Sequence, residues 1–177
     1  MKIQGNNIKL RNIEEKDLEF LRQMINDKEI SKMTVGDSSY ISKEQQKEWF
    51  KNLKNEKNKI RFMIDIKENT IGTVILENID EKNKKASVSI KIGTKELKNK
   101  GYGTETLKLI LNYAFEELKL HRIYANVLEY NEPSRKLFVK CGFKVEGVQR
   151  QSIYKNKEFY DLIMFSILKE EYENNAN

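Results

Sequence analysis

Hydrophobic positions along the chain follow two periods, and their order predicts a protein of mixed α/β class. Residues 14–25 carry apolar side chains near the spacing of one helix face, which predicts a helix. Residues 86–92 read Ala-Ser-Val-Ser-Ile-Lys-Ile, an alternation typical of a strand. The same reasoning predicts further strands at residues 8–11, 60–66, 71–79, 122–128, about 145–154 and 159–168.

The other helices are marked by their end signals. Ser42 and Gln45 have the spacing of a capping box, so we expect a helix at about residues 43–53. A glycine-containing loop precedes a longer helix that ends near residue 118. Pro133 stands in the first turn of a short helix, which ends at Gly142.

Length and composition predict one globular domain. The chain has 177 residues, of which 38% are hydrophobic and 34% charged, and we expect a single domain over residues 1–177. Its core should span about residues 7–170, and residues 172–177 should form a frayed tail. No apolar run reaches the length of a membrane helix, and no signal peptide is visible, so we expect no membrane partner. One cysteine, Cys141, excludes an internal disulfide and favours a cytoplasmic location.

The formal net charge of +6 favours an anionic ligand, but its distribution weakens that argument. Lysines are scattered along the whole chain and alternate with acidic residues, as in residues 44–57. No basic stripe with interleaved aromatics is present, so nucleic acid is not expected as a partner; that alternative rests only on a pI of about 9.2. With one histidine and one cysteine, no metal site is expected.

A candidate phosphate site stands at Lys98-Asn99-Lys100-Gly101-Tyr102-Gly103-Thr104, before the strongly helical run that follows. Glycines at the start of a helix leave backbone N–H groups bare at the positive end of the helix dipole. A dinucleotide fingerprint would need a third glycine at Thr106, and no Walker-type run occurs. From these residues alone, a phosphate loop and an ordinary turn both stay open.

A second motif, Asn131-Glu132-Pro133-Ser134 to Phe138, is followed by Cys141-Gly142-Phe143. Together with the glycine loop and the order of elements, it resembles the GNAT superfamily of acetyl-CoA-dependent N-acetyltransferases over about residues 7–170. The resemblance implies a single-domain α/β (α+β) GNAT fold. Its central sheet is mixed and mostly antiparallel, has about 6–7 strands, is splayed at the cofactor site and is flanked by about four helices.

Within the superfamily, the chain resembles the branch of ribosomal-protein N-terminal, spermidine and amino-sugar acetyltransferases. This narrower resemblance is carried by residues 8–11, by Trp49 and Phe50, by Glu146-Gly147 and by Tyr160-Asp161. It implies a transferase that moves an acetyl group from acetyl-CoA to a primary amine by direct attack in a ternary complex. Coenzyme A would be the product. Members of this fold often pair, so a homodimer through the last hairpin or the strand edges is expected.

The resemblance also implies the residues that contact acetyl-CoA. The glycine loop would bind the pyrophosphate, one strand would pair with the pantetheine arm, and the Asn131 helix would contact the cofactor from the other side. These residues are Ile90, Lys91, Ile92, Lys98, Asn99, Lys100, Gly101, Tyr102, Gly103, Thr104, Asn131, Ser134, Arg135 and Phe138. Lys98 stands where arginine or glutamine is usual and lacks a planar fork of donors.

The chain departs from the family pattern at two places that bear on catalysis. Phe138 replaces the tyrosine that is the usual general acid, so the candidate substitutes are Ser134, Tyr130 and a water. Ser87 replaces a strand glutamate, which leaves a water chain or a carboxylate such as Glu77 or Asp161 as the base.

The acceptor pocket is expected near four residues: Trp49, Glu77, Ser87 and Tyr154. A protein N-terminus, a small-molecule amine, a nucleotide-linked amino sugar and a polyamine all stay open as acceptors. A polyamine is disfavoured by the missing strand glutamate and the positive net charge. An alternative of another class is a non-catalytic acyl-CoA-binding sensor, because both usual acid and base side chains are absent.

Overall fold

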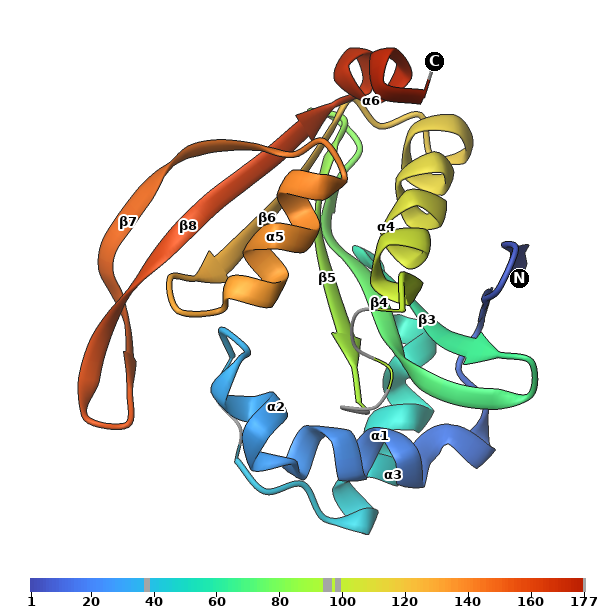
Figure 1. The fold of residues 1–177 in the computed structure, drawn as a ribbon. Helices are drawn as coiled ribbons and strands as arrows, with labels where there is room; N and C mark the ends of the chain where they lie inside the picture. Colours follow the sequence, from blue (N-terminus) through green and yellow to red (C-terminus); the bar gives the residue numbers. More distant parts are fainter. Residues whose placement is uncertain (37–38, 94–96, 98–99, 177) are drawn as a thin grey trace.

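The computed structural model describes residues 1–36, 39–93, 97 and 100–176. These residues form one mixed sheet of eight strands in the order β1-β2-β3-β4-β5-β6-β8-β7 (Figure 1). The strands are β1 (Lys2–Gln4), β2 (Lys9–Arg11), β3 (Lys59–Ile66), β4 (Asn69–Asp80), β5 (Lys85–Ile92), β6 (Arg122–Leu128), β7 (Lys144–Lys155) and β8 (Glu158–Leu168).

Neighbouring strands of the described sheet are antiparallel, with one exception. β5 and β6 run parallel, and their pairing is confined to Lys85–Ser87 of β5 against Arg122–Tyr124 of β6. A parallel pair needs a crossover, and the helix that follows the glycine loop supplies it. The sheet therefore consists of two antiparallel halves that meet at a short parallel contact.

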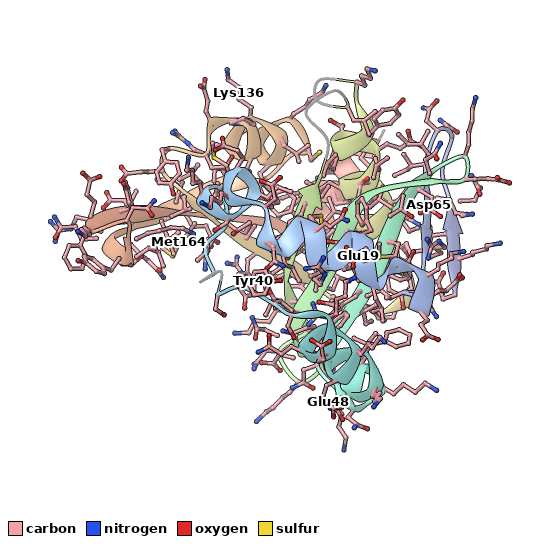
Figure 2. The ribbon with its side chains drawn as sticks, turned by 90° about the horizontal axis from the view of Figure 1, so that it is seen from below. Glu19, Tyr40, Glu48, Asp65, Lys136 and Met164 are labelled. Carbon is pink, nitrogen blue, oxygen red and sulfur yellow. The ribbon has the colours of Figure 1, made fainter. Side chains whose placement is uncertain are left out.

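Helices lie on both sides of the sheet. They are α1 (Leu18–Asn26), α2 (Lys28–Lys32), α3 (Lys43–Asn52), α4 (Tyr102–Asn112), α5 (Glu132–Lys140) and α6 (Lys169–Ala176). Seen from below, Lys136 on α5 and Glu48 on α3 lie on opposite sides of the molecule (Figure 2). α1 and α2 cross the end of the sheet at which β5 ends (Figure 1).

The main core fills the space between the sheet and α4 and α5. Leu107 and Ile110 of α4 and Phe115 of the turn that follows it are fully buried there, together with Phe62 and Phe165 from the sheet. A smaller apolar cluster of Leu21, Met24 and Met63 lies under α1, with Trp49 packed against it. Among the described residues, no helix is both long and apolar enough to span a bilayer.

The predicted fold class is confirmed, and the structure adds three elements that the sequence analysis did not predict. β1 pairs with β2 alone and has three residues, which are too few to show the alternation of a strand. α2 has five residues, too few to show a helical period. The sheet thus has eight strands where about 6–7 were expected.

The third added element, α6, occupies a segment for which a frayed tail was expected. The carboxylate of Glu171 accepts a hydrogen bond of 3.0 Å from the Leu168 N–H, just before the first turn. The ring of Tyr172 packs on Phe115 at 5.2 Å between centroids. The Glu171 contact is local and caps the start of the helix, whereas the Tyr172 contact ties the helix to the rest of the fold.

Candidate active site

The centre of the candidate site is the gap that opens between β5 and β6. Both strands are described along their full length, and beyond Ser87 and Tyr124 no register pairs them, although β5 continues to Ile92 and β6 to Leu128 (Figure 1). The ends of the two strands therefore move apart toward α2. This confirms the predicted splay of the sheet.

Among the described residues, no strand pairs with the edge of β5 that faces the gap beyond Ser87. The Gly93 N–H donates to the Ile71 carbonyl of β4 at 2.8 Å. Because backbone groups of consecutive strand residues point to opposite edges, the N–H and C=O of Ile92 and Ile90 point into the gap. Backbone groups of Lys91 point to β4 instead. The predicted pairing of a pantetheine arm with β5 can therefore involve Ile90 and Ile92.

Gly72 allows β4 to approach β5 closely at this end. A Cβ atom at Gly72 would lie 2.1 Å from the carbonyl oxygen of Lys91 and 3.0 Å from the Cα atom of Ile92. A backbone contact of this kind cannot be relieved by turning a side chain. Gly72 was not among the predicted site residues, because a glycine inside a strand pattern does not say which backbone it faces.

The N-terminus of α4 lies beside the gap. Gly101 has φ +85°, a conformation that favours glycine, and no side chain of the described residues caps the helix there. A Cβ atom at Gly103 would lie 3.4 Å from Leu137 of α5 and 3.7 Å from Ile92 of β5. The first N–H groups of α4 thus lie where α4, α5 and the free edge of β5 meet.

The remaining residues of the predicted phosphate loop are only partly placed. Lys98 and Asn99 lie outside the described residues. Lys100 is exposed, and Tyr102 and Thr104 are half-buried in the first turn of α4. A helix N-terminus that no described side chain caps suits a phosphate, since the backbone N–H groups and the helix dipole both favour an anion.

Glu105 ties this turn of α4 to the N-terminal strands. Its carboxylate accepts hydrogen bonds from the N–H of Asn7 at 2.8 Å, the N–H of Ile8 at 3.3 Å and the Asn7 side-chain amide at 3.0 Å. Burial raises the pKa of Glu105, but these donors outweigh burial and leave the pKa below its usual value. The start of α4 is therefore fixed by a contact almost 100 residues away in sequence.

The start of α5 lies on the other side of the gap. The Asn131 side chain caps α5 by accepting the Ser134 N–H at 3.2 Å, so Ser134 takes part in the cap through its backbone. Arg135 is exposed, and its guanidinium donates to the Glu129 carbonyl at 2.9 Å. The Phe138 ring is 3% exposed and packs edge-on against Phe143 at 4.9 Å.

Tyr130 and Asn131 are also joined to α2. The Tyr130 hydroxyl donates to the Lys32 carbonyl at 2.6 Å, and the Asn131 side-chain amide donates to the Met33 carbonyl at 2.8 Å. Burial raises the pKa of Tyr130. Both side chains therefore position the segment after α2, which closes one side of the gap.

Two of the four predicted acceptor residues, Glu77 and Ser87, lie on the sheet face covered by α1 and α3, and a third, Trp49, lies on α3 itself. Ser87 lies opposite Glu77 in the register, and its hydroxyl donates to the Glu77 carbonyl at 3.0 Å. The Glu77 carboxylate pairs with Lys59 at 3.0 Å. Trp49 is half-buried, and the Arg61 guanidinium lies 5.5 Å from its ring centroid.

Tyr154 lies apart from these residues. Its ring is 64% exposed near the tip of the β7–β8 hairpin, where it packs on Phe159 at 4.8 Å. Asp161, an alternative base, lies on β8 and accepts the Gln151 N–H at 2.7 Å. Asp161, Gln151 and Arg150 line an open hollow of about 590 Å³. The roles assigned to these side chains stay predictions.

The structure thus brings the glycine loop, the end of β5 and the start of α5 around one gap. Sequence reasoning missed Arg61 and Lys155, besides Gly72. The Lys155 ammonium donates to the carbonyls of Ser31 at 2.7 Å and Thr34 at 2.8 Å, and so reaches α2 from the far end of β7. No local signal marks such contacts.

Comparison with known proteins identifies the arrangement. The family model of the acetyltransferase (GNAT) domain matches residues 7–144. The uncharacterized N-acetyltransferase p20 of Bacillus licheniformis is 32% identical over 167 residues, which cover 92% of this chain and 93% of p20. Spermidine N(1)-acetyltransferase of Vibrio cholerae is 29% identical over 168 residues, which cover 94% of this chain and 96% of that protein.

A solved structure of the Vibrio cholerae spermidine N-acetyltransferase, in complex with CoA and spermine, has the same fold. It superimposes with a TM-score of 0.88 at 28% sequence identity, and the match covers 96% of this chain and 100% of that one. The similarity therefore extends over both halves of the sheet and over the gap between them.

Proposed function

Because the chain belongs to the acetyltransferase (GNAT) family, we propose that the gap between β5 and β6 is the place where an acetyl group passes from acetyl-CoA to a primary amine. One observation carries this proposal: β5 and β6 part after Ser87, beside the N-terminus of α4, which no described side chain caps. The parted strands leave a free backbone edge next to an anion-binding helix end. Acceptors of this reaction are a protein N-terminus or a small-molecule amine.

The residues present fit acetyl-CoA. The N–H groups of the first turn of α4, from Tyr102 to Thr104, would bind the pyrophosphate, and Lys100 would add charge beside it. The free edge of β5 at Ile90 and Ile92 would hold the pantetheine arm as a further strand. Asn131 and Arg135 would contact the cofactor from α5. When bound, acetyl-CoA supplies an activated acetyl thioester.

The chain's own contribution to catalysis is orientation, charge stabilisation and proton movement. The Ile92 N–H points into the gap and is the candidate donor to the oxyanion that forms during attack. α2, α5 and the end of β5 surround the gap and would hold the amine close to the thioester. Bringing the two reactants together in this way supplies a large part of the rate enhancement. Ser134 and Tyr130 remain the candidate proton donors, with Glu77 or Asp161 as candidate bases.

A second function of another class is kept because Phe138 and Ser87 stand where the family has a tyrosine and a glutamate. A phenyl ring has no proton to give, and its burial against Phe143 and Phe165 fits a packing role. In that alternative, the chain binds acyl-CoA without turnover and acts as a sensor.

Calorimetry and a turnover assay together test the proposed function. Wild type should bind acetyl-CoA with micromolar affinity, should not bind NAD or ATP, and should release coenzyme A when an amine panel is added. Gly103→Trp should abolish acetyl-CoA binding, because the new side chain would fill the space between Leu137 and Ile92.

Lys157→Trp is the control for Gly103→Trp, because Lys157 is exposed on the turn of the β7–β8 hairpin, away from α4. Thermal unfolding of both variants separates lost binding from lost folding. Binding without turnover of any amine would support the sensor instead. Failure of the wild type to bind acetyl-CoA would overturn the proposal.

A further inference from the structure

The two faces of β5 carry side chains of different chemistry. Ile90 and Ile92 face α4 and pack against the main core. Lys91 lies opposite Thr73 in the register and therefore shares the other face of the sheet with Ser87 and Ser89. That face is covered by α1 and α3, and it also carries Glu77 and Ser87, two of the residues proposed to bind the acceptor. The side chain of Lys91 thus lies on the acceptor side of the gap.

Lys91 lines a small hollow between the end of β5 and the first two helices. Its other lining residues are Met24, Ile25, Ile30, Ser31, Thr34 and Gly36. The hollow has a volume of about 60 Å³, which is room for about two water molecules. It can therefore hold one small polar group of a ligand, and the rest of that ligand must extend into the gap.

The described charged side chains near Lys91 are already engaged, and none of them supplies it with a partner. Lys59 pairs with Glu77 at 3.0 Å, and Arg61 pairs with Glu56 at 3.0 Å. The Lys155 ammonium donates to the backbone carbonyls of Ser31 in α2 and of Thr34 just after it.

Within the part of the chain that the structure describes, Lys91 has no hydrogen bond or ion pair. Burial lowers its pKa; the carboxylate of Glu77 opposes this, while Arg61 and Lys155 add to it. An ammonium group in such a place is costly without a counter-charge. An anionic group bound in the hollow would supply that counter-charge, whereas the second ammonium of a polyamine would increase the repulsion.

We infer that Lys91 determines acceptor specificity, and that the acceptor is a primary amine with an anionic group, a carboxylate or a phosphate, in the same molecule. The inference rests on the proposed function, since it assigns the substrate class of the same site. The amine reaches the gap while the anionic group occupies the hollow beside Lys91. The preference differs from that in the name of the Vibrio cholerae relative, whose substrate is a polycation.

Pairs of amines that differ only in the anionic group test this inference. We would measure kcat/KM with acetyl-CoA for β-alanine against propylamine, for glucosamine 6-phosphate against glucosamine, and for spermidine. Wild type should prefer the anionic member of at least one pair by about tenfold or more, the range expected for a buried contact to a charged group. The two pairs separate a carboxylate from a phosphate.

Lys91→Met should lose this preference, because the anionic group then has no counter-charge, and Lys91→Glu should shift the preference toward spermidine. Lys85→Met is the matched control, since Lys85 lies at the other end of the same strand, where β5 still pairs with β6. It should keep the wild-type preference. Acetyl-CoA affinity, measured for every variant, separates a change in acceptor choice from a folding defect.

Two results would overturn the inference. In the first, wild type has the same kcat/KM for propylamine, glucosamine or spermidine as for the anionic amines. The proposed function would then stand, and the role of Lys91 would be removed. Retention of the preference by Lys91→Met would remove that role as well. Absence of turnover with every amine, despite bound acetyl-CoA, would instead overturn the proposed function together with the inference.

Discussion

At the scale of single residues, the end of β5 depends on a close approach of two backbones. Gly72 on β4 has no side chain, and the Lys91 carbonyl occupies the place that a Cβ atom would take. The same short stretch of β5 carries Ile92, with its free N–H, and Lys91 itself. The position of these groups relative to the gap is therefore set by a residue of the neighbouring strand, through its lack of a side chain.

Gly72→Ala tests this dependence. A Cβ atom 2.1 Å from a backbone oxygen forces β4 and β5 apart, so we expect a loss of about 1–3 kcal/mol of unfolding free energy and a lower kcat/KM. Urea unfolding and the acetyl transfer assay measure the two effects. Gly93→Ala is the control, since its nearest contact would be an ordinary 3.6 Å from Phe20. Equal stability of the two variants would contradict the argument.

At the scale of elements, an ion pair joins β6 to β7 across the strand between them. The Arg122 guanidinium donates to the Glu146 carboxylate at 2.6 Å. This hydrogen bond lowers the pKa of Glu146 from 4.5 to about 2, although burial acts against it. Because the folded-state pKa is lowered, the pair's contribution to stability is present above pH 4.5. It is lost as the pH falls toward 2.

The pH dependence of unfolding gives the second prediction. Wild type should be more stable than Glu146→Gln at pH 6, by less than about 1 kcal/mol, because both side chains are partly exposed. The difference should shrink between pH 4.5 and 2.5 in urea unfolding followed by circular dichroism. Glu132→Gln, which breaks an exposed pair on α5, should show a smaller difference at pH 6. A difference for Glu146→Gln that is constant with pH would contradict the prediction.

Elements that carry a local signal could be predicted from the sequence, and those held by distant contacts could not. The Ser42 capping box is present as expected, with the Gln45 N–H bonded to the Ser42 hydroxyl oxygen at 3.2 Å. α2 has such a local cap at Asp27, but its other end is held by Tyr130, Asn131 and Lys155. Those residues lie about 100 or more positions away in the sequence, so no pattern near α2 predicts these contacts.

The residues of the candidate site likewise fall into those that a local sequence pattern marks and those that only distant contacts bring to the site. Gly101, Gly103 and Asn131 could be found because glycines before a helix and an Asn-x-Pro-Ser start are local patterns. The alternation of residues 86–92 also predicts that the side chain of Lys91 lies on one face of the strand and those of Ile90 and Ile92 on the other. The lining of the hollow beside Lys91 depends on how α1 and α2 pack against β5. This packing is a property of the tertiary structure, and no local pattern predicts it.

At the scale of the whole molecule, the first and last thirds of the chain meet around the gap. α2 comes from the N-terminal third, and the β7–β8 hairpin from the C-terminal third (Figure 1). Outer positions of β7, such as Val145 and Val148, are 57% and 47% exposed. Pairing of two copies through this hairpin stays a prediction.

Lys155 is the side chain through which the hairpin holds α2, and it gives the last prediction. Its ammonium donates to the carbonyls of Ser31 and Thr34, at 2.7 and 2.8 Å, across more than 120 positions of sequence. Lys155→Met removes the side chain that ties both carbonyls to the hairpin, so we expect amide hydrogen exchange in residues 28–34 to rise by about tenfold or more.

The acceptor KM of Lys155→Met should rise more than the acetyl-CoA KM, because Ser31 and Thr34 line the hollow beside Lys91 whereas α4 is untouched. Lys157→Met, on the turn of the same hairpin, removes an equal charge from an exposed position and is the control. Equal exchange in the two variants would mean that Tyr130 and Asn131 hold α2 without Lys155. Equal shifts in both KM values would mean that the hairpin supports the fold as a whole rather than the acceptor side of the gap.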